Sequence, residues 1–282
     1  MPEQDVLVRF LLESADVRGV YARLDQSWRE ALSRANYPTT VQRLLGEAMA
    51  ATALLSASIK FSGKLTLQVK GDGPVRLLVV QVTQQGHLRG LADWRNTPPA
   101  GPLSAVLGSA QMVISITGTE SQVDYQGIVA LEGETLADAL CHYFARSEQL
   151  DTQLRFHVTA NAVTGFLLQK LPGVSKDPDG WDRAQQLAAT LQPQELATLG
   201  VEDLLHRLYH EEVVRVFPAT SLRFLCHCSR QRVATMILGL GKQEAQAILQ
   251  EQGVIEVTCE FCNAQHRFND EDVKALFTSA AS

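Results

Sequence analysis

Residues 65–92 read LTLQVKGDGPVRLLVVQVTQQGHLRGLA, and this stretch indicates the class of the fold. Its first residues alternate apolar and polar side chains, which is the period of a half-buried strand. The turn sequences GDGP (residues 71–74) and QQG (residues 84–86) divide the stretch into three β-type runs. These runs span residues 65–69, 75–82 and 87–92. Three strands joined by short turns predict an antiparallel meander.

The flanking sequence continues a mixed pattern of helices and strands. Apolar side chains recur at helical spacing in residues 47–60 and 134–148, which predicts two helices. Two further β-type runs, residues 112–117 and 123–131, are predicted to form another strand pair, and residues 154–159 and 164–171 are predicted to continue the sheet. Strands follow strands with few helices between them, so the predicted fold class is α+β, with an N-terminal mixed domain of antiparallel sheet and packed helices.

A change of composition marks the end of this domain. Residues 171–180 are rich in turn-forming Pro, Gly and Asp, and short helical segments follow. These predicted helices span residues 181–191, 193–199 and 201–209, and their leucines are Leu187, Leu191, Leu196, Leu204, Leu205 and Leu208. Helices this short are marginal alone and must dock on another surface. We therefore divide the chain into a core domain (residues 1–175), a helical linker (176–221) and a small C-terminal domain (222–282).

Composition and charge restrict the kind of protein. The chain has 282 residues, 45% of them apolar and 20% charged, which suits a globular protein of two domains. A net charge of −6 gives no reason to expect nucleic acid as a partner. No secretory signal is visible, and the longest nearly apolar stretch, residues 48–59, is shorter than the roughly 20 residues of a membrane-spanning helix. We expect a cytoplasmic protein with no membrane partner.

Four of the five cysteines crowd into the last quarter of the chain, as a Cys-x-Cys pair and a Cys-x-x-Cys pair with 30 residues between them. They are Cys226, Cys228, Cys259 and Cys262. Such clustering indicates metal or redox chemistry rather than a disulfide framework. Zinc binds four thiolates tetrahedrally, at about 2.3 Å. The sequence therefore predicts one Zn²⁺ on these four cysteines, in a C-terminal zinc-binding domain with no open position for a catalytic water.

The remaining candidate residues have simpler interpretations. His227 and His266 could each replace a cysteine in a three-thiolate site, although four sulfurs suffice. The fifth cysteine, Cys141, shares a helix face with Ala137 and Phe144, so we interpret it as a small buried hydrophobe. The other histidines lie in no catalytic arrangement that we recognise, and no phosphate-binding loop is present. We predict that the protein is not an enzyme.

The C-terminal domain is so small that its folding is expected to depend on the bound metal. A core of roughly 60 residues supplies at most ~3–5 kcal/mol of stability. Structural zinc contributes on the order of 10–16 kcal/mol in comparable small domains. Oxidation removes the metal, because a disulfide sulfur is not a thiolate ligand. The sequence thus predicts a domain whose folding depends on the redox state of its cysteines.

Over nearly its whole length the chain resembles the redox-regulated 33 kDa heat-shock chaperone family. The matching C-terminal residues are Ser229-Arg230 after the Cys-x-Cys pair, Leu240-Gly241, Glu251-Gln252-Gly253 and Val257 before Cys259. The matching core-domain residues are Gly46-Glu47, Gly71-Asp72-Gly73-Pro74, Tyr143-Phe144, Ser147-Glu148-Gln149 and Gln169-Lys170-Leu171-Pro172. One departure is His227, which stands where the family commonly has aspartate.

The resemblance implies an ATP-independent holdase of the stress response, nearly inactive while reduced and zinc-bound. The zinc ligands would be the four clustered cysteines, and strong oxidant would form the disulfides Cys226–Cys228 and Cys259–Cys262 with release of zinc. The C-terminal segment would unfold, the linker helices would loosen, and the exposed apolar surface would bind unfolding client proteins. The active form in the family is a homodimer. From the residues alone, the linker leucines are better explained as permanent core of a second subdomain.

Two other classes compete with this interpretation. A zinc ribbon that binds nucleic acid should be basic, but residues 222–282 contain six basic and seven acidic side chains. A thiol–disulfide oxidoreductase usually places its Cys-x-x-Cys pair at a helix N-terminus beside a βαβ unit. Here the β-type residues 254–257 precede the pair. Both alternatives are disfavoured.

Overall fold

The strands predicted in residues 65–92 form the middle of a six-stranded sheet as antiparallel neighbours, so the predicted meander is confirmed. The order in this sheet, sheet B, is β12-β5-β4-β3-β6-β7, and the short edge strand β12 runs parallel to β5. Its strands are β3 (Lys64–Gly71), β4 (Val75–Thr83), β5 (His87–Trp94), β6 (Ala110–Thr117), β7 (Val123–Ala130) and β12 (Arg223–Phe224).

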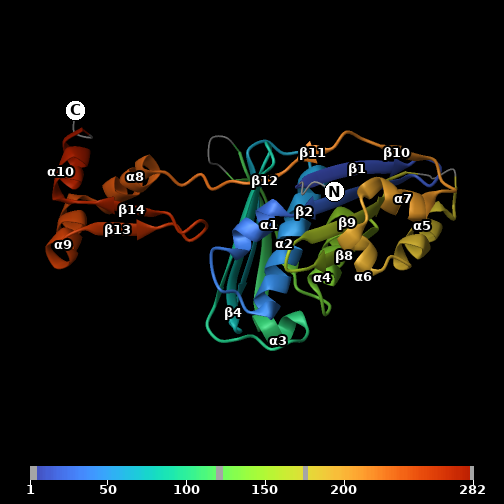
Figure 1. Cartoon of the computed structure of the whole chain (residues 1–282), viewed down its shortest axis with the longest axis horizontal. Helices are drawn as coiled ribbons and strands as arrows, with labels where there is room; N and C mark the ends of the chain where they lie inside the picture. The colour runs from blue at the N-terminus through green and yellow to red at the C-terminus, as the bar shows by residue number, and fades with distance from the viewer. Residues whose placement is uncertain (1–4, 119–122, 174–176, 280–282) are drawn as a thin grey trace. The chain divides into compact units, whose positions relative to one another are not determined.

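The computed structural model describes residues 5–118, 123–173 and 177–279. The chain forms two units, Met1–Leu225 and Cys226–Ser282 (Figure 1). Helices and antiparallel strands occur together in both units, which confirms the α+β class. The predicted linker belongs to the first unit, and its separation from the core as a domain stays a prediction. None of the described helices is long and apolar enough to span a membrane.

A second six-stranded sheet, sheet A, corrects one sequence-based expectation. The runs at residues 154–159 and 164–171 do not continue the meander's sheet; as β8 and β9 they join an N-terminal hairpin. The strands of sheet A are β10 (Val214–Val216), β1 (Val6–Leu12), β2 (Val17–Leu24), β9 (Val163–Lys170), β8 (Thr152–Val158) and β11 (Thr220–Ser221). The expectation was wrong because apolar alternation specifies which face of a strand is buried, and not which strand lies beside it.

Helix α2 (Thr39–Ser58) packs against strands of both sheets in the main core (Figure 1). It begins before the predicted start at residue 47. Its apolar period extends upstream to Val41, Leu44 and Leu45. Gly46 allows a close approach to β8, since a Cβ at this position would lie 2.9 Å from side-chain carbons of Val158. The helix therefore lies close enough to seal the inner face of sheet A.

The predicted helix at 134–148 is divided into α4 (Leu136–Tyr143) and a π-helical turn, η1 (Phe144–Glu148). Thr135 caps α4, because its hydroxyl accepts a hydrogen bond from the backbone N–H of Asp138 at 3.1 Å. Half-buried Cys141 on α4 packs against the main core. The two remaining helices of this region are α1 (Gln26–Leu32) and α3 (Leu103–Leu107).

Three short helices cover the outer face of sheet A, opposite α2 (Figure 1). They are α5 (Gly180–Ala189), α6 (Pro193–Thr198) and α7 (Val201–Tyr209), close to the predicted bounds. The sheet contributes to this second cluster the side chains Phe10, Leu12, Val17, Tyr21, Phe166 and Leu168. The helices and the connection between α5 and α6 contribute Trp181, Leu191, Leu196, Leu204, Leu205, Leu208 and Tyr209. β9 lies between the two clusters and is buried on both faces, including the polar side chains of Thr164 and Gln169.

The C-terminal unit is small. It contains α8 (Arg230–Leu240), α9 (Lys242–Gln252), the hairpin β13 (Ile255–Thr258) and β14 (Gln265–Phe268), and α10 (Asp270–Ser279). Its buried cluster consists of Val233, Ala234, Ile237, Ala245, Ile255, Phe268 and Val273. A core of seven side chains, two of them alanines, leaves little apolar surface to stabilise the unit.

Candidate metal centre

Two short segments bring the four clustered cysteines together. Cys226 and Cys228 lie in the extended segment before α8, whose first turn is capped by the Ser229 hydroxyl. Cys259 and Cys262 lie in the turn between β13 and β14. The turn closes with hydrogen bonds from the N–H of Cys259 to the Ala264 carbonyl, at 2.9 Å, and from the N–H of residue 263 to the Cys259 carbonyl, at 2.7 Å. Each pair is therefore positioned by local backbone geometry.

The four sulfur atoms have the spacing of a tetrahedral thiolate site. All lie within 4.8 Å of one another. The Sγ atoms of Cys226 and Cys259 are 3.6 Å apart, and those of Cys228 and Cys262 are 3.2 Å apart. A tetrahedron with zinc–sulfur bonds of about 2.3 Å has edges of about 3.8 Å. The residues present thus fit a zinc ion, and no backbone rearrangement is needed to bring the donors together.

A cation among the four sulfurs would stabilise their thiolate form. Burial raises the pKa of the Cys228 thiol well above its usual range, and the neighbouring sulfurs of Cys262, Cys226 and Cys259 raise it further. Burial also raises the pKa of Cys262. Four thiolates crowded together repel one another, so they coexist near neutral pH only around a compensating positive charge. A soft divalent cation supplies that charge and lets all four sulfurs act as ligands.

Arg230 connects the first ligand pair to the rest of the unit. Its guanidinium donates to the Arg267 carbonyl at 2.5 Å, pairs with Asp272 at 2.8 Å, and lies 4.2 Å from the centre of the Phe268 ring. One side chain thereby joins the start of α8 to β14 and α10. The sequence analysis included Arg230 in a family motif without giving it a role. The spacing of the motif alone could not reveal its partners, which lie 37 or more residues away.

Replacing Arg230 with alanine is expected to weaken metal binding. The segment bearing Cys226 and Cys228 would lose the Arg230 contacts that join it to the β13–β14 hairpin. Loss of residues that orient metal ligands typically lowers metal affinity on the order of 10–100-fold. Competition with a chromophoric chelator measures the effect. Lys274→Ala is the matched control, since the exposed Lys274 side chain pairs with Asp270 on the same helix, α10. Equal affinities of the Arg230→Ala and wild-type proteins would contradict this role.

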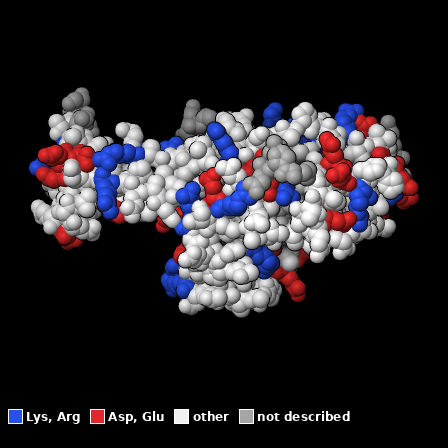
Figure 2. Space-filling view, in the orientation of Figure 1, with Lys and Arg blue, Asp and Glu red and all other residues white. Residues whose placement is uncertain are grey.

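Other candidates from the sequence lie outside the cluster. Neither His227 nor His266 contributes a ring nitrogen to it, and Cys141 belongs to the other unit. Among the described residues, no second group of three or more potential ligands of this kind is present. On the face shown in Figure 2, acidic and basic side chains lie side by side over the C-terminal unit. This face lacks the continuous basic surface expected of a nucleic-acid-binding ribbon.

Comparisons with known proteins agree with this fold. The model of the family described as Hsp33 protein matches residues 5–269. A 33 kDa chaperonin of Nitrosococcus oceani is 46% identical over 278 residues, covering 99% of this chain and 96% of that protein. A 33 kDa chaperonin of Chromobacterium violaceum is 44% identical over 282 residues, covering 98% and 95%. The crystal structure of a 33 kDa chaperonin of Thermotoga maritima has a similar fold, with a TM-score of 0.83, 22% identity and 99% coverage of both chains.

Proposed function

This chain belongs to the Hsp33 protein family, and on that premise we propose that it is an ATP-independent holdase chaperone switched on by oxidation of a zinc centre. The zinc ligands in this proposal are Cys226, Cys228, Cys259 and Cys262. The observation that carries it is the cluster of four sulfurs in a unit with a seven-residue core. In such a unit, ligand chemistry and folding are coupled.

When bound, zinc keeps the four sulfurs deprotonated and joins the two ligand segments. Oxidation proceeds on the thiolates. One thiolate attacks a peroxide oxygen, the O–O bond breaks, hydroxide leaves and a sulfenic acid forms. The second thiolate of the pair attacks that sulfur, and a second hydroxide leaves as the disulfide forms. Two thiolates lose two electrons to one peroxide, and two of the four donors are lost.

The loss of donors is large compared with the stability of the unit. Metal binding on the order of 10–16 kcal/mol disappears, whereas a core of this size supplies at most ~3–5 kcal/mol. The chain of this unit continues directly from β12, and α7 precedes β10, β11 and β12. In our proposal, the folded C-terminal unit holds the chain that follows α7 in place. When residues beyond 226 unfold, this restraint is lost, and α5–α7 then loosen from sheet A. These helices are short and depend on docking.

The surface under the linker suits a client-binding role. The outer face of sheet A presents the aromatic side chains of Phe10, Tyr21 and Phe166 beside aliphatic ones. Uncovered apolar surface attracts unfolded chains with roughly 25 cal/mol per Å² buried. The proposed partners are accordingly unfolding client proteins, with a homodimer as the oxidised form and no nucleic acid or membrane involved. We further propose a cytoplasmic protein of the stress response that catalyses no reaction.

The reduced protein should contain one zinc ion per chain. Replacing Cys259 with serine removes one of four soft donors, so zinc affinity should fall by at least an order of magnitude. Metal analysis after dialysis against a weak chelator measures both quantities. Cys141→Ser is the control, because Cys141 lies outside the cluster. Well under one zinc per wild-type chain, or full affinity in the Cys259→Ser protein, would refute the site.

The oxidised protein should contain Cys226–Cys228 and Cys259–Cys262 disulfides, as the family resemblance implies. Cys226 also lies close to Cys259, and Cys228 close to Cys262, with sulfur distances of 3.6 and 3.2 Å, so the alternative pairing must be tested. Trypsin separates the possibilities, since residues 224–230 and 243–267 form separate peptides. Local pairing leaves two unlinked peptides, each lighter by two hydrogens. A single cross-linked species in the mass spectrum would overturn this pairing.

A further inference from the structure

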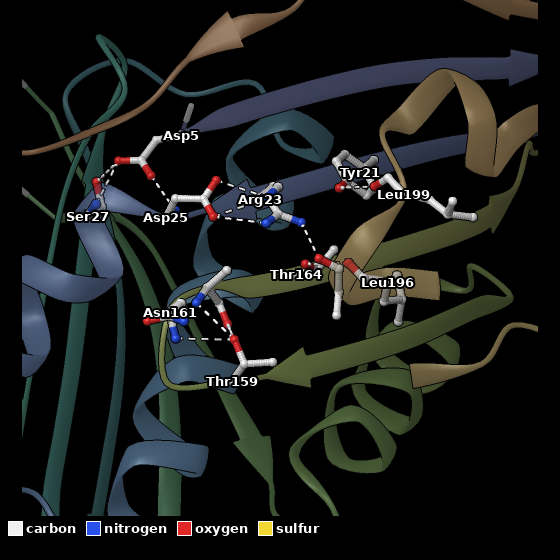
Figure 3. Close-up of polar contacts among 12 residues, drawn as sticks. Asp5, Tyr21, Arg23, Asp25, Ser27, Thr159, Asn161, Thr164, Leu196 and Leu199 are labelled. Atoms are coloured by element: carbon white, nitrogen blue, oxygen red, sulfur yellow. Dashed lines mark hydrogen bonds and ion pairs between the residues drawn. The ribbon is translucent and has the colours of Figure 1, made fainter. Parts of the chain in front are cut away.

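Three side chains of sheet A bind the end of helix α6 through its backbone (Figure 3). The Thr164 hydroxyl donates to the Leu196 carbonyl at 2.9 Å. The Arg23 guanidinium donates to the carbonyl of residue 197 at 2.8 Å. The Tyr21 hydroxyl lies 3.5 Å from the Leu199 carbonyl. The last carbonyls of a helix have no N–H partner within the helix. These side chains supply the missing donors, and for buried Leu196 this avoids the cost of an unpaired carbonyl.

Strand pairing and further hydrogen bonds position the donors Arg23 and Thr164. Arg23 and Thr164 are direct neighbours across the β2–β9 pairing. Asp25, which is 4% exposed, accepts three hydrogen bonds from the Arg23 guanidinium, at 2.9 to 3.2 Å. Asp5 in turn accepts the backbone N–H of Asp25 at 2.6 Å and that of Ser27 at 2.8 Å (Figure 3). Asp25 and Asp5 therefore position the Arg23 guanidinium through contacts that do not involve α6.

The three side chains of sheet A bind backbone carbonyls of α6, so they depend on the conformation of its backbone and not on its side chains. A helix of six residues is unstable in isolation, and its cationic neighbour Arg23 lies at the negative end of the helix dipole. All three donors remain on β2 and β9 if α6 unwinds. None of them belongs to the unit that contains the four clustered cysteines. Hydrogen bonds from β2 and β9 thus hold α6 on the sheet, and these bonds do not involve the metal site.

We propose that Tyr21, Arg23 and Thr164 form a carbonyl latch that holds α6 on sheet A and limits opening of the linker while the metal is bound. The structural part of this inference stands on the contacts alone, and its regulatory part rests on the proposed function. Loss of the latch opens α6 in the reduced, zinc-loaded protein. The linker then uncovers the apolar face of the sheet without any oxidation.

Thr164→Val tests the latch with little change of shape, because valine replaces the hydroxyl by a methyl group on a strand. Amide hydrogen exchange in residues 193–199 of the reduced, zinc-loaded protein should accelerate on the order of ten- to hundredfold, the effect of one unpaired buried carbonyl. Zinc content should stay at one per chain. Thr66→Val is the matched control: Thr66 is a buried strand threonine of sheet B whose hydroxyl contacts Gln81 instead of α6.

Arg23→Lys provides a second variant that keeps a cation beside buried Asp25 but lacks the planar fork. It should accelerate the same amides. Unchanged exchange of α6 in both variants, or equal acceleration in Thr66→Val, overturns the latch. Client holding by the reduced Thr164→Val protein above the wild-type level supports the regulatory part, and an opened α6 without such a gain refutes it. Failure of the proposed function is a different result, namely an oxidised wild-type protein that holds no client.

Discussion

Removing the metal from the reduced protein with a strong chelator will unfold residues 226–279 while α2 and the strands of sheet B stay folded. The C-terminal unit buries seven apolar side chains, and a core of that size supplies at most ~3–5 kcal/mol. Structural zinc supplies on the order of 10–16 kcal/mol. The N-terminal unit has two large apolar clusters of its own and contains none of the four clustered cysteines. The metal therefore decides the folding of the C-terminal unit and, in our proposal, the docking of α5–α7, but not the folding of the main core.

Amide hydrogen exchange measured with and without chelator will test this. Protection of α8, α9 and α10 should be lost, and protection of α2 and β3–β6 should persist. Addition of excess zinc to the chelated protein should restore the lost protection, which separates metal loss from irreversible damage. A C-terminal unit that keeps its protection after verified removal of zinc would show that its small core suffices. The proposed switch would then lose its physical basis.

Peroxide treatment will convert the protein into one that suppresses aggregation of a heat-denaturing client at near-stoichiometric ratios, without any nucleotide. The reduced, zinc-loaded protein will not do so. The physical reason is the covered face of sheet A, where Phe10, Tyr21 and Phe166 pack under α5–α7 in the folded state. Each large apolar side chain that passes from water into a client contact contributes about 1.5–3 kcal/mol. Several together suffice for strong binding.

Light scattering of the client measures this effect, and Cys141→Ser is the control. Burial raises the pKa of the Cys141 thiol, so it is a poor nucleophile near neutral pH and its replacement should leave switching intact. Loss of switching in Cys141→Ser would place the redox chemistry outside the four-cysteine cluster. Equal protection by reduced and oxidised protein would refute the switch even if the zinc site is real. Protection by neither form would refute the chaperone assignment.

Much of the local structure was predictable. The turns GDGP and QQG, the alternation in residues 65–69 and the leucine spacing of the linker helices all depend on neighbours within a few residues. The structure has the corresponding meander and helices close to the predicted bounds. The N-terminal hairpin β1–β2 was not predicted, and β8 and β9 were assigned to the wrong sheet. Strand partners depend on contacts between distant residues, which periodicity does not encode.

The sequence by itself determined the chemistry of the candidate metal centre. Soft thiolates in two close pairs specify a ligand set through residue type and short spacing, and the structure brings all four sulfurs within 4.8 Å. Tertiary structure alone decided how the linker is held. The acceptors on α6 are backbone carbonyls, which every residue possesses, and Tyr21 lies 178 residues from its partner Leu199. A group common to all residues leaves no signature in a sequence, so only the folded arrangement of β2, β9 and α6 identifies it.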